Sequence, residues 1–190
     1  MTQAYYTYKE ALDIVEDFMI KSGIRRYCEN VCRGKCCSEV WDEEEERYIP
    51  CWKSKVACWR NEGRRLPCSI YVCASLLEIL PDKGNTLYYL KQKIVGVLWD
   101  IMDDNPYFTP NTEEVQRKFC IPKEELDVLK SIDIKRYRRI MKFLRKNHIK
   151  IYDLPYRYMR LLKHRISRMK TGGYATTPIW GWHWLRRIKR

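Results

Sequence analysis

The chain has 190 residues and a formal net charge of +13, with 45% hydrophobic and 13% aromatic residues. This length and apolar content allow one or two compact domains with a buried core, and they exclude an intrinsically disordered chain. Eight glycines and eight prolines exclude collagen-like and low-complexity classes. Because no stretch approaches the ~20 apolar residues of a membrane span and the N-terminus lacks a signal-peptide pattern, we expect a cytoplasmic protein without a membrane partner.

Hydrophobic periodicity predicts a mainly α chain without internal repeats. The predicted helices cover residues 8–21, 68–80, 86–104, 112–119, 122–132, 134–147 and 155–170. Gly23 is placed to end the first of them. The segment 28–73 lacks periodicity and is expected to be loop-rich, with its acidic run 42–46 a solvated loop. We expect three parts: an N-terminal helix and cysteine domain over 1–80, a helical domain over 86–150, and a basic aromatic helix and tail over 151–190.

Eight of the nine cysteines fall within 46 residues, in the spacing C-x3-C-x3-C-C-x13-C-x6-C-x9-C-x4-C. Without a secretion signal, clustered thiols indicate metal ligation before disulfides, because thiolates are soft anionic ligands for Zn²⁺ and iron–sulfur clusters. Buried apolar cysteines or disulfides are the alternative. The predicted metal ligands are Cys28, Cys32, Cys36, Cys37, Cys51, Cys58, Cys68 and Cys73. Cys120 stands apart, on the apolar side of a short predicted helix, and is expected in the core.

The cysteine segment also resembles a known family. The residues Cys32-Arg33-Gly34-Lys35-Cys36-Cys37, then Cys51, Cys58 and Cys68-Ser69-Ile70-Tyr71, resemble the zinc- or iron-chelating cysteine-cluster family of small bacterial and archaeal proteins. That family has a C-x-G-x-C-C-like core, spaced cysteines and a C-x-I-Y segment near the end. The resemblance implies a bound metal, zinc or an iron–sulfur cluster, and implies little about biochemical role.

Positive charge is concentrated at one end of the chain. Residues 130–190 carry 19 Lys and Arg against two acids, a balance of +17, whereas residues 1–129 have a balance of −4. Such an asymmetry is typical of a protein with a polyanionic partner, most often nucleic acid. An anionic membrane surface, or a solvated cationic face without a specific partner, is the alternative.

The predicted helix 134–147 combines an apolar stripe with a dense cationic face. Tyr137, Ile140, Met141 and Leu144 fall on one side, and cations without any acid fill both flanks. A helix docked in this way suits the major groove of DNA, although an ordinary amphipathic helix has the same pattern. The predicted nucleic-acid-binding residues are Lys135, Arg136, Arg138, Arg139, Lys142, Arg145, Lys146, Arg157, Arg160 and Lys163.

From Lys93 onward the chain resembles the helix-turn-helix and winged-helix domains of transcription regulators. Residues 123–151 correspond to the helix–turn–recognition helix pair, with 131–134 as the turn, although the turn lacks glycine. The resemblance implies DNA binding by the second helix of the pair. RNA binding stays open, because Trp180, Trp182 and Trp184 in the basic tail are able to stack on unpaired bases.

These patterns favour a metal-containing nucleic-acid-binding protein, in the first place a DNA-binding regulator. A zinc ion would be a structural staple, whereas an iron–sulfur cluster would suit a redox sensor. The alternatives are an RNA-binding structural component of a ribonucleoprotein particle, and an iron–sulfur redox or nucleic-acid-processing enzyme. Enzymatic activity is disfavoured, because the sequence has no phosphate-binding loop, nucleophile elbow or convincing acid pair.

Overall fold

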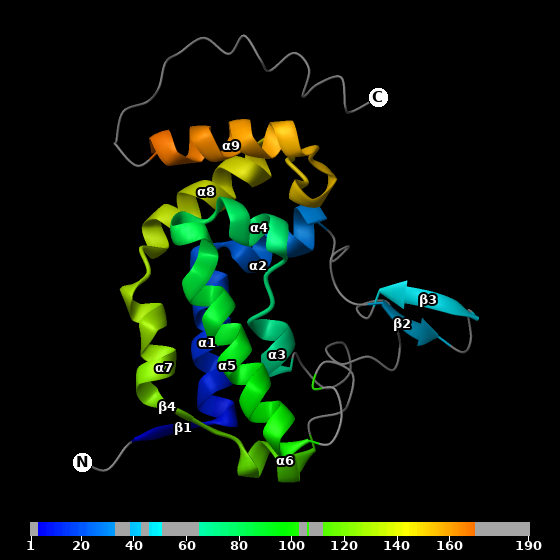
Figure 1. Ribbon diagram of the computed structural model, residues 1–190, viewed down its shortest axis with the longest axis vertical. Helices are drawn as coiled ribbons and strands as arrows, with labels where there is room; N and C mark the ends of the chain where they lie inside the picture. Colours follow the sequence, from blue (N-terminus) through cyan, green and yellow to red (C-terminus); the bar gives the residue numbers. More distant parts are fainter. Residues whose placement is uncertain are drawn as a thin grey trace.

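The computed structural model describes residues 4–32, 39–42, 46–50, 65–102, 106 and 112–169, and these are mainly helical (Figure 1), as the periodicity predicts. Nine of the described elements are α-helices: α1 (Tyr8–Ser22), α2 (Ile24–Tyr27), α3 (Leu66–Ser69), α4 (Ala74–Ile79), α5 (Asn85–Ile101), α6 (Glu113–Lys118), α7 (Lys123–Asp127), α8 (Ile134–Lys146) and α9 (Tyr156–Arg168). A π-helix, η1 (Cys28–Cys32), follows α2, and 3-10 turns cover Pro81–Gly84, Val128–Ser131 and Ile151–Asp153.

The ends of α1 are set by its sequence. Thr7 caps its N-terminus by accepting a hydrogen bond from the backbone N–H of Glu10, whose carboxylate accepts one from the N–H of Thr7 at 2.8 Å. This reciprocal pair satisfies two backbone donors that a helix start leaves unpaired. At the other end Gly23 adopts φ +82°, which confirms the predicted stop.

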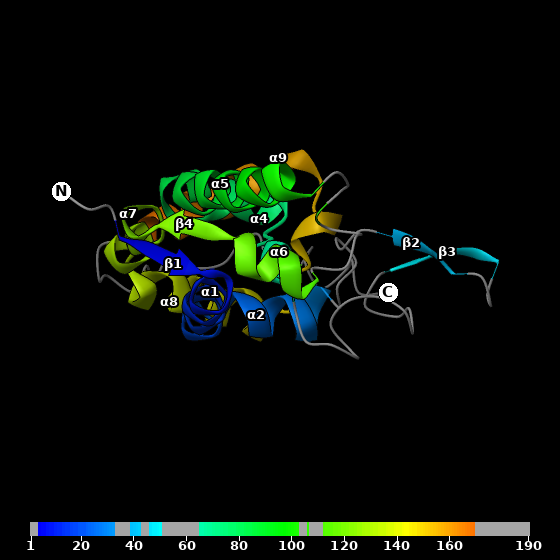
Figure 2. The same cartoon turned by 90° about the horizontal axis from the view of Figure 1, so that it is seen from below.

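One hydrophobic core joins the described helices. Its buried side chains come from described elements between Tyr8 and Ile166, so residues on both sides of the predicted boundary at 80–86 share it. The predicted stripe of α5 is buried through Leu87, Ile94 and Leu98. Figure 2 shows α5 on one side of the helical body and α1 with α8 on the other. This arrangement leaves the outer face of α8 on the surface.

Two short antiparallel strand pairs lie outside the helical prediction. β1 (Tyr5–Thr7) pairs with β4 (Cys120–Pro122), with Tyr6 opposite Ile121. Side chains alternate along a strand, so Ile121 is buried while Cys120 is exposed. The expectation that Cys120 lies in the core is therefore wrong. Within the cysteine segment, β2 (Glu39–Asp42) pairs with β3 (Arg47–Pro50), and residues 43–45 of the acidic run lie outside the described residues.

The junction between α4 and α5 depends on a glycine. Gly84 has φ +61°, and a Cβ there would lie 2.7 Å from Leu77 Cδ2 and 3.0 Å from Leu77 Cα. We expect Gly84→Ala to lower the free energy of unfolding by about 2 kcal/mol, through backbone strain and overpacking. Gly96→Ala is the matched control, because no described atom lies within 4 Å of its added Cβ, and it should stabilise α5 by about 0.5–1 kcal/mol. Urea unfolding measures both; equal stability of the two variants would contradict this packing.

Candidate cysteine site and basic surface

The structure describes four of the eight predicted metal ligands. Cys28 and Cys32 lie at the two ends of η1, Cys68 lies on α3, and Cys73 is the N-cap residue of α4. Cys36, Cys37, Cys51 and Cys58 lie outside the described residues. No disulfide joins any two of the five cysteines in the described part of the chain.

A break in the predicted helix 68–80 determines where Cys73 lies. The structure has two helices here, because Cys73 adopts an extended conformation with φ −65° and ψ 151°. The side chains of Ile70 and Val72 in the connecting segment are buried, so tertiary packing outweighs local helical preference, and the single predicted helix is wrong. As a result, Cys73 lies close enough to Cys32 for charges on the two sulfur atoms to interact.

Cys32 is buried beside Tyr27, the last residue of α2. The Tyr27 side chain is fully buried, and its hydroxyl donates to the backbone oxygen of Ile149 at 2.7 Å and accepts from the backbone N–H of Ile151 at 3.1 Å. The single hydrogen of the phenol is therefore donated to the backbone.

Burial is the main cause of the raised pKa values of the Cys32 thiol and the Tyr27 phenol. It raises the pKa of the Cys32 thiol, although the hydrogen bond with Tyr27 partly opposes this, and the neighbouring Cys73 raises it further. Burial, followed by the charge of Cys32, raises the pKa of the Tyr27 phenol. A metal ion that replaced the proton of this thiol would supply a positive charge beside the buried sulfur.

The described surroundings of Cys32 do not by themselves complete a metal site. Among the residues that the structure describes, no group of three or more His, Cys, Asp and Glu is gathered closely enough to hold a metal ion.

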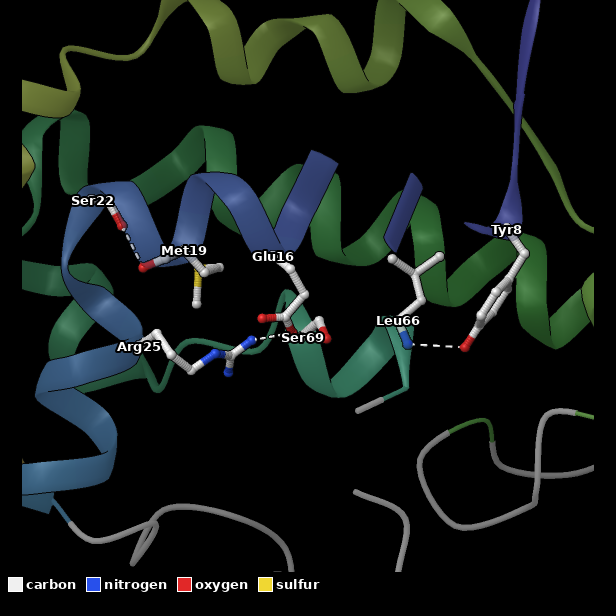
Figure 3. A network of polar contacts seen from close by, with 7 residues as sticks. All are labelled: Tyr8, Glu16, Met19, Ser22, Arg25, Leu66 and Ser69. Atoms are coloured by element: carbon white, nitrogen blue, oxygen red, sulfur yellow. Dashed lines mark hydrogen bonds and ion pairs between the residues drawn. The ribbon is translucent and has the colours of Figure 1, made fainter. Parts of the chain in front are cut away.

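A second polar cluster, shown in Figure 3, fixes the helix that carries Cys68. Glu16 of α1 accepts hydrogen bonds from the guanidinium of Arg25 on α2 and, at 2.5 Å, from the hydroxyl of Ser69 on α3. Tyr8 accepts a further bond from the backbone N–H of Leu66 at 2.9 Å. The cluster joins three helices near the cysteines; its residues were not predicted to interact.

The basic face of α8 is exposed as the sequence predicts. Tyr137, Ile140, Met141 and Leu144 are buried, and α8 packs chiefly against α1 and α2. Five cations point to solvent and two are half-buried; the exposed ones are Lys135, Arg138, Arg139, Lys142 and Lys146, and the half-buried ones are Arg136 and Arg145. We call the five exposed side chains the α8 stripe. None of the seven forms an ion pair with a carboxylate in the described part of the chain.

Helix α9 packs against α4 and also reaches α8. The guanidinium of Arg165 stacks 5.3 Å from the centre of the Phe143 ring of α8. Of the predicted binding residues on α9, Arg157 and Arg160 are exposed, whereas Lys163 forms an ion pair with Glu78 of α4. At the other edge, Arg138 donates from Nε to the backbone oxygen of Lys21 at 3.0 Å, where α1 ends.

No protein-family model, curated protein or solved structure matches this chain. Among the residues that the structure describes, no helix is both long and apolar enough to cross a membrane.

Proposed function

We propose that the protein binds nucleic acid, duplex DNA in the first place, through the α8 stripe together with Arg157 and Arg160 of α9. The observation that carries this proposal is that the cations of α8 have no carboxylate partner among the described residues. Elsewhere on the described surface, lysines such as Lys93 and Lys118 are paired with glutamates at 3.0 and 2.7 Å. Unpaired cations gathered on one face repel one another, and phosphates relieve that repulsion by releasing bound counterions.

The shape of α8 supports a duplex as the partner. From Lys135 to Lys146 the α8 stripe extends about 16 Å along the helix axis at 1.5 Å per residue. A helix of this kind fits the major groove, where Arg and Lys contact phosphates and guanine edges. Asp133 caps the start of α8 by accepting from the N–H of Arg136 at 2.9 Å, which leaves the helix a defined end next to the preceding turn. Assignment of 123–151 to a helix-turn-helix remains a proposal.

Binding to three nucleic acids of equal length tests this function. The full chain is titrated with fluorescent duplex DNA, duplex RNA and single-stranded RNA at several salt concentrations. We expect the tightest binding to duplex DNA, with an affinity that falls steeply as salt rises, because each neutralised phosphate contributes about −0.9 to the slope of log K against log salt. A clear preference for RNA would instead support a ribonucleoprotein component. Failure to bind any of the three would overturn the proposal.

We also propose that the cysteines hold a metal, either zinc or an iron–sulfur cluster, as the resemblance to the cysteine-cluster family implies. The burial of the Cys32 side chain and the electrostatic influence of Cys73 on its thiol support this proposal. The metal would supply the positive charge that a buried thiolate needs. If both Cys32 and Cys73 were ligands, it would also crosslink η1 and α4. Zinc would serve as a structural ion, and a cluster as a redox-sensitive one.

Replacing Cys32 tests the metal site directly. We expect Cys32→Ser, purified without added metal and under anaerobic conditions, to carry less than half of the metal of the wild-type protein, because a serine hydroxyl is a poor ligand for these metals. Cys120→Ser is the matched control, since Cys120 is exposed on β4, and its metal content should be unchanged. Elemental analysis and the visible spectrum distinguish zinc from a brown iron–sulfur protein. A wild-type protein that contains no metal would contradict this proposal. Catalytic turnover by a protein that contains an iron–sulfur cluster would support the enzyme alternative.

A further inference from the structure

One side of α5 is exposed and carries aromatic residues but no charge. At about 100° per residue, its exposed residues fall within an arc of about 100° around the helix axis. We call them the α5 face; they are Asn85, Tyr88, Tyr89, Gln92, Gly96 and Trp99. The α8 stripe, by contrast, consists of cations only. The two exposed helix faces of the molecule therefore suit different partners.

The aromatic residues of the α5 face offer enough apolar area for a small interface. The exposed fractions are 43% for Tyr88, 65% for Tyr89 and 53% for Trp99. Since an aromatic side chain has about 150–250 Å² of surface, the exposed parts amount to roughly 300 Å². A standard protein interface covers about 800 Å² on each partner, and Tyr and Trp are enriched at the centre of such interfaces. A contact made through this face is therefore smaller and weaker than a standard one.

The charge distribution favours a second copy of the chain as the partner. With a net charge of +13, two copies repel one another over most of their surface. The two lysines beside the α5 face are already engaged: Lys93 pairs with Glu125 at 3.0 Å, and the Lys91 Nζ lies 5.3 Å from the centre of the Tyr88 ring. The α8 stripe lies on the other side of the helical body (Figure 2). Two copies that meet at α5 therefore bring little unpaired charge together, whereas a nucleic acid would need cations on this face.

The α5 face is complementary to itself when two copies cross antiparallel. Around the helix, Tyr89 and Gly96 lie toward one edge of the face, Tyr88 and Trp99 toward the other, and Gln92 between them. A two-fold axis beside Gln92 sets each edge against the same edge of the second copy. Tyr89 then lies over Gly96 of the other copy, where no described atom comes within 4 Å of an added Cβ. The two Gln92 amides, each with donors and an acceptor, face one another.

We propose that the protein forms a symmetric dimer through the α5 face, in which two α5 helices cross antiparallel at Gln92. Tyr89 of each copy fills the space over Gly96 of the other, and Tyr88 meets Trp99. This inference goes beyond the proposed function and does not depend on it, because the contact needs neither nucleic acid nor metal. The dimer leaves the α8 stripe of both copies uncovered.

Sedimentation equilibrium of the full chain without nucleic acid tests the dimer. We expect the wild-type protein to pass from monomer to dimer over the micromolar range. The double variant Tyr89→Glu, Trp99→Glu should raise the dimer Kd at least a hundredfold, because it places two like charges from each copy in one contact. The matched control is Ile20→Glu with Leu161→Glu on α1 and α9, where the side chains are 62% and 59% exposed. Its Kd should stay within threefold of the wild-type value.

An uncharged variant separates this specific crossing from general apolar association. Gly96→Gln keeps the net charge and the helix but occupies the space that Tyr89 needs, so we expect it to raise the Kd at least tenfold. Gly96→Ala is still expected to stabilise the monomer, which urea unfolding measures below the dimer Kd. Circular dichroism verifies that α5 is intact in each variant.

Three outcomes would overturn the dimer. The first is a wild-type protein that stays monomeric throughout the micromolar range. The second is a dimer that survives the double glutamate variant, and the third is a Kd that Gly96→Gln leaves unchanged. If the wild-type protein were monomeric and the double glutamate variant lost affinity for single-stranded RNA, unpaired bases stacked on the rings would be the partner instead.

Discussion

Replacing Lys135, Lys142 and Lys146 together by glutamine is expected to weaken binding to duplex DNA by about 10² to 10³-fold near 0.1 M salt. All three belong to the α8 stripe, and none has a carboxylate partner in the described part of the chain. Each lost phosphate contact removes about 0.9 from the salt slope, so the slope should fall by about 2.7. The measurement is the affinity of the variant and wild type over a series of salt concentrations.

The control for this variant removes the same charge from other lysines. Lys93, Lys118 and Lys130 are each paired with a carboxylate, at 3.0, 2.7 and 2.8 Å. Their triple replacement by glutamine lowers the net charge equally, and we expect it to weaken binding by less than tenfold. Equal losses in the two triple variants would mean that net charge alone drives association and that α8 is not the contact surface. Circular dichroism of both variants verifies that their helices are intact.

The amphipathic helices could be predicted from the sequence because their signal is local. In α8, the spacing of Tyr137, Ile140, Met141 and Leu144 alone identifies the buried side, and the structure buries all four. The absence of acidic side chains around the α8 cations can be predicted only in part from the sequence. The sequence shows that α8 contains no acid, but which carboxylates approach from other elements depends on the tertiary fold.

The short strands could not be predicted, because three residues carry too little pattern. β1 and β4 each span three residues, and their partners lie more than a hundred positions apart. A helical pattern predicts Cys120 in the core, but side chains alternate along a strand, so in β4 Ile121 is buried and Cys120 is exposed. The break before α4 has a similar cause, since buried Ile70 and Val72 hold an extended segment within an otherwise helical stretch.

The number and clustering of the cysteines predict the candidate site, but they do not predict how its residues are arranged in the fold. Spacing does not predict which thiols influence one another, because loop closure allows many pairings of eight thiols. The place of Tyr27 next to Cys28 is its one signal in the sequence, and it is too weak to predict the buried hydrogen bonds of its hydroxyl. Glu16 offered a clearer signal, since it lies four positions after Leu12 and next to the buried Val15, at the edge of the apolar face of α1.

Replacing that carboxylate is expected to have the largest effect on stability. In the wild-type protein Glu16 pairs with Arg25, whose side chain is 12% exposed, and accepts from Ser69, which is fully buried. Glu16→Ala leaves a nearly buried guanidinium without its counter-charge and a hydroxyl without its acceptor, so we expect a loss of about 3–4 kcal/mol in the free energy of unfolding. The Arg25 Nε is already buried without a hydrogen-bond partner among the described residues, so loss of the Glu16 carboxylate would leave this side chain with still fewer partners.

The neighbouring residue on the same helix provides the control. Asp17 pairs with Lys21 at 2.7 Å, but both side chains are more than half exposed, so Asp17→Ala should cost less than about 1 kcal/mol. Urea unfolding of the two variants measures the difference, and Glu16→Gln should fall between them because an amide oxygen still accepts from Ser69. If Glu16→Ala and Asp17→Ala were equally stable, water would have to solvate Arg25 once its partner is gone. The three helices that the cluster joins, including the one that carries Cys68, would then be held together by apolar packing alone.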